Sequence, residues 1–166
     1  KQNITLEPLE WTRLKDGGLE IERTLPNKVS FGVRVTPTRT EVRMELWLTN
    51  GTDQPLTDLR VQNCVLFRGA SGFEHRTGEN KVHASPFVAC RASNGKQWVI
   101  TAWEPVHRVW DNPPCPCMHS DPILPDCAPG QTTRARGWLS FFEGPDVQPE
   151  LRRIAATNWA STGSAR

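Results

Sequence analysis

The segment TEVRMELWLT, residues 40–49, carries the pattern that decides the fold class. Its apolar side chains occupy every second position from Val42 to Leu48, and charged residues or Trp47 fill the positions between them. Successive side chains of a β-strand point to opposite faces, so this alternation predicts a strand with one face in a core. A buried face opposite a polar face is typical of an antiparallel sheet.

Similar alternation recurs on both sides of this segment. Strands bounded by Gly, Asn and Pro turn signals are predicted at 19–22, 28–36, 59–67, 87–92, 97–103 and 132–142. Asp146 follows the last of them and predicts the start of a short helix that continues through Thr157. We therefore expect an all-β fold, an antiparallel β-sandwich or jelly roll of about seven to nine strands with one short C-terminal helix.

The 166 residues are enough for one domain with a single hydrophobic core. We expect residues 1–159 to form that domain and residues 160–166 to be a flexible tail. The phrase LWLTNGTDQPLTDLRV, residues 46–61, resembles the hairpin of many extracellular immunoglobulin-like and carbohydrate-associated sandwiches. Asn50-Gly51 would be the turn of that hairpin.

Charge and hydropathy exclude two classes of partner. The formal net charge is +2, and Lys and Arg are scattered among Asp and Glu, so we expect no nucleic-acid partner. No apolar run approaches the roughly 18 residues of a membrane span, so we expect none. The sequence begins at Lys1, which suggests a processed or trimmed chain, and seven Trp with no Tyr mildly favour an extracellular ligand-binding protein. We expect a secreted or periplasmic location, and the oligomeric state stays open.

Residues 100–130, ITAWEPVHRVWDNPPCPCMHSDPILPDCAPG, hold most of the residues that carry chemistry. This stretch contains seven of the 14 prolines, three of the five cysteines and two of the four histidines. Long loops inside compact domains are uncommon unless they are functional or disordered, and prolines stiffen the chain. We therefore expect a long, rigid Pro/Cys-rich loop over residues 103–127 that forms a ligand site.

The cysteines allow three interpretations, a metal site, a disulfide or free thiols. Cys115, Cys117, His119 and Cys127 offer thiolate and imidazole ligands, which suit one zinc or copper ion. Only one residue separates the first two cysteines, where structural zinc sites usually have two to four. We therefore weigh a disulfide from Cys115 or Cys117 to Cys127 above the metal site, with a stabilisation of about 3 kcal/mol.

Four residues are candidate acid/base groups. His119 and Asp121 lie two residues apart and suit proton transfer or a mixed metal site, or else a local turn. His107 is a further candidate, and Glu143 would act with Glu104 if their strands were neighbours, as a glycosidase carboxylate pair does. The chain has no G-x-S-x-G motif, so a serine hydrolase of that type is not supported.

Aromatic and polar residues near the same stretch suggest a ligand surface. Aromatic rings stack on sugar rings, and polar side chains bind the hydroxyl groups around them. The alternative is that the tryptophans pack in the core. The candidate ligand-binding residues are Trp103, Arg108, Trp110, Asp111 and Trp138.

Three functional hypotheses follow. The leading one is an extracellular β-sandwich domain that recognises a carbohydrate or another small polar ligand. The second is a metal-dependent enzyme with copper or zinc that acts on a polysaccharide or a small polar substrate. The third is a protein-interaction domain of a larger chain. The sequence leaves open whether the protein is an enzyme.

Overall fold

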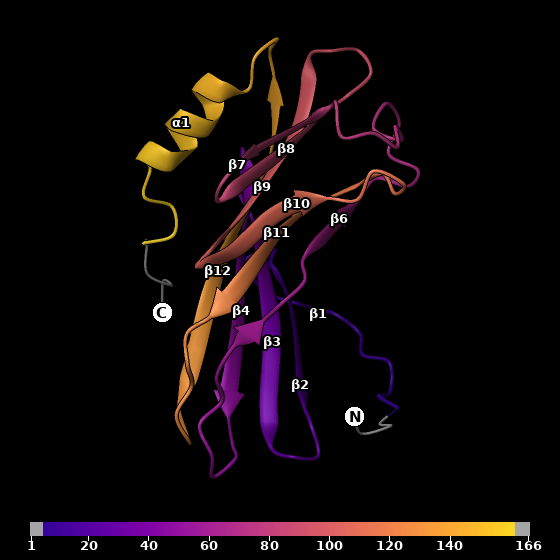
Figure 1. Cartoon of the computed structure of the whole chain (residues 1–166). Coiled ribbons are helices and arrows are strands. Elements are labelled where there is room, and N and C mark those ends of the chain that lie inside the picture. Colours follow the sequence, from indigo (N-terminus) through magenta and orange to yellow (C-terminus); the bar gives the residue numbers. More distant parts are fainter. Residues whose placement is uncertain (1–4, 162–166) are drawn as a thin grey trace.

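The computed structural model describes residues 5–161 (Figure 1). That part of the chain forms twelve strands and one helix, which confirms the expected all-β sandwich with a short C-terminal helix. The strands exceed the expected number because several have only two to four residues. The elements are β1 (Thr12–Arg13), β2 (Leu19–Thr24), β3 (Val29–Pro37), β4 (Glu41–Asn50), β5 (Leu59–Arg60), β6 (Cys64–Leu66), β7 (Lys81–Ala84), β8 (Phe87–Arg91), β9 (Gln97–Glu104), β10 (Val106–Asp111), β11 (Cys117–Leu124), β12 (Thr132–Glu143) and α1 (Gln148–Ala156).

The strands form two antiparallel sheets. The large sheet has the order β1-β2-β3-β4-β12-β9-β8-β7, and the small sheet has the order β10-β11-β5, with β6 also paired to β11. Figure 1 shows β10 and β11 lying across the large sheet. No helix in the described residues is long and apolar enough to cross a membrane.

The strand that decided the fold class lies in the middle of the large sheet. β4 pairs with β3 on one side and β12 on the other, in register Leu46↔Val33 and Leu46↔Ala135. These apolar residues pack with Leu124 of the small sheet in one core cluster. The alternation in residues 40–49 therefore places one face of β4 against the second sheet, as predicted.

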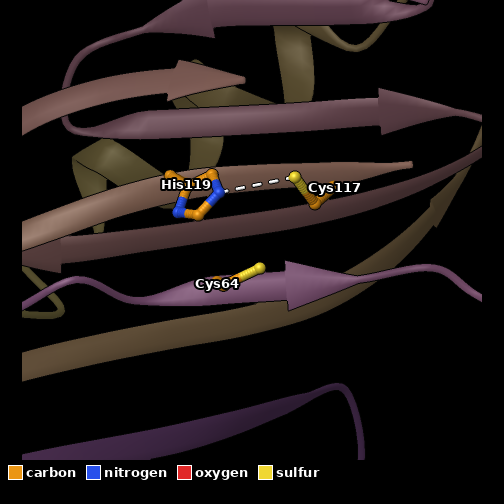
Figure 2. Close-up of side chains that lie close together, drawn as sticks. All are labelled: Cys64, Cys117 and His119. Atoms are coloured by element: carbon orange, nitrogen blue, oxygen red, sulfur yellow. Dashed lines mark hydrogen bonds between the residues drawn. The ribbon is translucent and has the colours of Figure 1, made fainter. Parts of the chain in front are cut away.

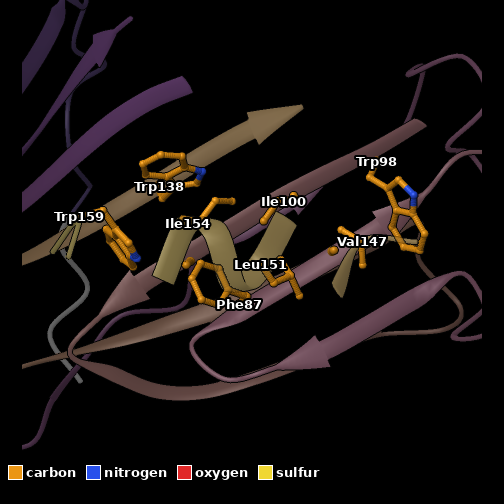
Figure 3. Close-up of a cluster of buried hydrophobic side chains, with 10 residues drawn as sticks. Phe87, Trp98, Ile100, Trp138, Val147, Leu151, Ile154 and Trp159 are labelled. Carbon is orange, nitrogen blue, oxygen red and sulfur yellow. The ribbon is translucent and has the colours of Figure 1, made fainter. Parts of the chain in front are cut away.

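Both faces of the other half of the large sheet are covered. In β9, Val99 packs between the sheets, and its neighbours Trp98 and Ile100 point to the opposite face. There α1 covers them with Leu151 and Ile154 (Figure 3). The helix thus replaces solvent on a sheet face that the sequence pattern marks as apolar.

The predicted Asn50-Gly51 hairpin is wrong. After β4 the chain leaves the large sheet and reaches β5 in the small sheet. The Asn50 side chain is fully buried and donates to the carbonyls of Gln54 and Cys127, each at 2.8 Å. Asn50 therefore joins two loops at this crossover instead of forming a two-residue turn.

Two further parts of the strand prediction differ from the structure. The segment at 59–67 is divided into β5 and β6, and Lys81–Ala84 forms β7, a strand that was not predicted. Of the predicted tail, Ala160 packs beside the α1 core, and residues 162–166 lie outside the described part.

Candidate metal centre

The region expected to be a long loop is a β-hairpin, so that prediction is wrong. β10 and β11 pair antiparallel, and only residues 112–116 connect them. Three prolines lie in this connection. Pro122 lies within β11, where it has no N–H to donate and its carbonyl accepts from the Val61 N–H. The prolines therefore stiffen a strand pair.

β11 presents its side chains alternately to the two faces of the small sheet. Met118 packs in the core between the sheets, and Ser120 hydrogen-bonds across to the large sheet. Cys117, His119 and Asp121 share the opposite face, and each is only 2% exposed. Three of the predicted chemical groups are thus brought together on one buried strip.

A third potential metal ligand, beside Cys117 and His119, comes from a distant part of the chain. β6 pairs with β11 so that Cys64 lies opposite His119. The Sγ of Cys117 is 3.4 Å from Nε2 of His119, and the Sγ of Cys64 completes a group whose ligand atoms all lie within 4.8 Å of one another (Figure 2). We call Cys64, Cys117 and His119 the thiol–imidazole cluster.

The sequence analysis did not include Cys64 among the candidate ligands. The sequence pattern placed Cys64 on the polar side of its predicted strand. Its pairing with β11 joins residues more than 50 positions apart, and local periodicity does not predict such a pairing. The signal was a Cys-x-His pair on one strand and a cysteine on the polar side of another.

Cys115 lies beside the cluster. Burial first, and then the Cys115 thiol, raise the pKa of Cys117 to about 11. Burial also raises the pKa of Cys64, which is the exposed member of the cluster. Without a bound cation, both cluster thiols are therefore protonated at neutral pH.

A hydrogen-bonded network surrounds His119. The Trp110 ring stacks on the imidazole, with centroids 4.0 Å apart, and its Nε1 donates to Asp121 Oδ2 at 2.7 Å. Asp121 also accepts from Arg108 Nε at 2.9 Å and from the Asn63 N–H at 2.9 Å. This buried carboxylate is thereby held in one position, with its charge compensated by Arg108.

The imidazole itself is not fully paired. His119 Nδ1 is buried and makes no well-formed hydrogen bond within the described residues; it lies 3.7 Å from Asp121 Oδ1. Burial lowers the pKa of His119, against the opposing effects of Asp121 and the Asn63 backbone. The ring is therefore neutral at pH 7, which is the form that binds metal ions.

Cys127 lies away from the cluster. Its main chain forms an isolated antiparallel β-bridge with Leu56, and its thiol donates to the Gln131 carbonyl at 3.1 Å. All five cysteines are free thiols, so the predicted disulfide to Cys127 is not formed. The predicted ligand set thus divides into a group around β11 and an isolated Cys127.

The predicted ligand-binding surface is also divided. Trp103 and Trp138 are buried in core clusters, and the Trp110 ring contacts both the His119 imidazole and the Arg108 guanidinium. Asp111 pairs instead with His83, Nε2 to Oδ1 at 2.9 Å. His107 is exposed at an irregularity of β10, outside the cluster. The three tryptophans therefore do not form an open aromatic platform.

The carboxylate pair is not formed either. Glu104 and Glu143 align with opposite ends of β9, because Glu143 pairs with Gln97 and Glu104 pairs with Arg136. Seven residues of strand separate these ends by roughly 23 Å. A glycosidase pair needs about 5 to 9.5 Å, so Glu143 has no carboxylate partner in Glu104.

Comparison with known proteins supports the fold. No protein-family model matches the chain, and no curated protein is significantly similar. The Slr1438 protein from Synechocystis sp. PCC 6803 superposes with a TM-score of 0.52 at 9% identity, over 82% of this chain and 65% of that one. A candidate kojibiose phosphorylase from the human microbiome gives 0.57 at 10% identity, over 90% of this chain and 22% of that one.

A candidate aldose 1-epimerase from Klebsiella pneumoniae has a TM-score of 0.47 at 8% identity, over 92% of this chain and 58% of that one. The chain thus spans less than two thirds of the length of each of these structures. At such identities the first two likenesses show a shared sandwich fold and no more.

Proposed function

We propose that the protein binds one soft metal ion at the thiol–imidazole cluster. The observation that carries the proposal is the convergence of Cys64, Cys117 and His119 from two paired strands. Two sulfur atoms and one imidazole nitrogen are the donor set that zinc and copper(I) favour over magnesium or calcium.

The spacing of the donors supports a tetrahedral ion. A zinc ion with Zn–S of about 2.3 Å and Zn–N of about 2.0 Å keeps its ligand atoms roughly 3.5 Å apart. Cys117 Sγ and His119 Nε2 are already 3.4 Å apart. Because both residues lie on a paired strand, little backbone movement is needed to hold the ion.

Cys115 is the fourth donor in this proposal. It lies against Cys117 at the end of the turn that leads into β11. Three thiolates and one imidazole would close the coordination sphere, as in structural zinc sites, whereas catalytic zinc keeps one position for water. We therefore favour an ion that joins β6 and the 112–116 turn to β11 over the metal-dependent enzyme considered from the sequence.

Asp121 orients the imidazole in the same proposal. If Nε2 binds the ion, the proton of the neutral ring is on Nδ1, which lies on the side of Asp121. A carboxylate behind a metal-bound histidine fixes its tautomer and orientation. Trp110, Arg108 and the Asn63 backbone hold that carboxylate in place.

Cobalt(II) substitution tests this function. Titration of reduced protein with cobalt(II) should produce the intense thiolate charge-transfer absorption of a tetrahedral site. Cys64→Ser and His119→Gln should abolish or strongly weaken it. Cys127→Ser is the matched control, because this thiol is buried but lies outside the cluster. A spectrum that persists in both cluster variants would overturn the proposal.

We also propose carbohydrate recognition as a second function. Its support is the sandwich fold shared with the candidate kojibiose phosphorylase, at a TM-score of 0.57. Because Trp103 and Trp138 are buried, the sugar would bind at a surface other than the one expected from the sequence. Calorimetry with mono- and disaccharides tests the function for the whole chain, and no heat of binding with any of them would refute it.

A further inference from the structure

A hollow of about 530 Å³ lies beside the C-terminal end of α1. It is on the helix-bearing face of the large sheet, opposite the face that packs against the small sheet. Its volume is within the range of about 300 to 1,000 Å³ typical of small-molecule sites. Residues of β8, β9, β12 and α1 line it together with the chain that follows α1.

The hollow contains a carboxylate without a partner. The Glu104 side chain makes no hydrogen bond or ion pair with any residue from 5 to 161. It lies at the end of β9, in register with Arg136 of β12. A carboxylate held at a strand end and facing a hollow is an unused acceptor for ligand hydroxyl groups.

Two guanidinium groups complete the polar side of the hollow. Arg136 Nη1 donates to the Ala160 carbonyl at 2.7 Å, and Arg134 Nη1 pairs with Glu45 Oε1 at 2.7 Å. Each contact uses only part of the five N–H donors of an arginine. Both side chains are therefore positioned by the protein and still have donors for a ligand.

The opposite wall is apolar. Phe87 and Trp159 pack with their ring centroids 6.3 Å apart, next to Ile154 and Trp138 (Figure 3). These rings are largely buried, so the wall is formed before any ligand arrives. Phe87 and Trp159 are each only 5% exposed, so they form a fixed apolar backing of the hollow, and the polar side chains carry the recognition of a ligand.

The charges of the hollow indicate the kind of ligand. Arg134 and Arg136 are balanced by Glu45, which contacts both, and by Glu104. A site built for a phosphate or sulfate would have an excess of positive charge. We propose that this hollow binds a neutral polyhydroxylated ligand of one or two sugar rings, with Glu104 accepting from its hydroxyls.

This inference rests on the second proposed function, to which it adds a site, and it is independent of the metal centre. NMR titration of the ¹⁵N-labelled 166-residue chain with D-glucose, maltose and sodium sulfate tests it. Saturable shifts with a sugar should include the Trp159 indole and the Arg136 backbone amide. Glu104→Gln should weaken that binding about tenfold or more, because it removes a charged acceptor. Glu143→Gln changes an exposed carboxylate of β12 that lies beside the other end of β9, and it should leave the binding unchanged.

The outcomes separate the site from the function. Sugar shifts that avoid the hollow and survive Glu104→Gln would overturn this site and leave carbohydrate recognition standing. The absence of binding by either sugar would overturn both. Binding of sulfate in place of sugar would overturn the assignment of a neutral ligand.

Discussion

Cys117 Sγ and His119 Nε2 lie 3.4 Å apart on the same face of β11, with Cys64 of β6 completing the group. Strand geometry creates this proximity, because residues two positions apart point in one direction. The main chain on both strands is paired, so the donors are held together in the absence of an ion. We base the metal-binding proposal on this relationship.

Metal affinity should increase with pH. Burial raises the pKa values of Cys64 and Cys117, so both thiols must lose protons when the ion binds. His119 releases none, because burial lowers its pKa and the ring is already neutral. Competition with a chromophoric chelator between about pH 6 and 8 should show affinity falling as pH decreases, with at least two protons released per ion. Affinity that does not change across this interval would contradict thiolate ligation.

Asp121→Asn should lower both the stability of the fold and the affinity for the metal ion. The buried carboxylate accepts from Arg108, Trp110 and the Asn63 backbone, and an amide cannot accept at both ends. We expect the free energy of unfolding to fall by about 2 kcal/mol and the metal affinity by about tenfold. Denaturant unfolding and chelator competition measure the two effects. Asp126→Asn, at an exposed position on the same segment, should change neither.

Ile154→Ala should destabilise the fold through the helix. Ile154 is fully buried between α1 and the large sheet, near Trp138 and Phe87. Truncation of such a side chain usually costs about 2 to 5 kcal/mol. Urea denaturation should show this loss, and Arg152→Ala, on the exposed face of α1, should stay within about 0.5 kcal/mol of wild type. Equal stability of both variants would mean that α1 does not secure this face.

Gly32→Ala should destabilise the large sheet where β3 pairs with β2 and β4. A Cβ at Gly32 would come within 2.3 Å of the Trp47 ring and 2.6 Å of the Ile21 carbonyl oxygen. The indole is fixed in that position by its hydrogen bond to Glu22 at 2.8 Å. We expect a loss of about 1 to 3 kcal/mol in thermal or denaturant unfolding. Full stability would show that the ring moves without cost.

The sequence predicted the strands that have a clear period of two. In β4 the alternation of Val42 to Leu48 is strong because one face is in the core and the other is polar. The pattern failed where both faces of a strand are buried or its prolines suggest a loop, as in β11. Pro122 fits there because its carbonyl is used and its missing N–H is not needed.

The candidate site was predicted only in part, for a topological reason. Cys117, His119 and Asp121 lie on one strand, so their spacing alone indicated a shared face. Cys64 joins them through the pairing of β6 with β11, and Cys127 is removed from them by its pairing with Leu56. Neither long-range register follows from local periodicity.

The most direct test of the metal-binding proposal is the metal content of the natively purified, reduced protein, measured by mass spectrometry. We predict one equivalent of zinc or copper per chain, lost in Cys64→Ser and His119→Gln and retained in Cys127→Ser. A wild-type protein that stays metal-free after incubation with zinc would contradict the proposal. Equal metal content in wild type and both cluster variants would contradict it as well.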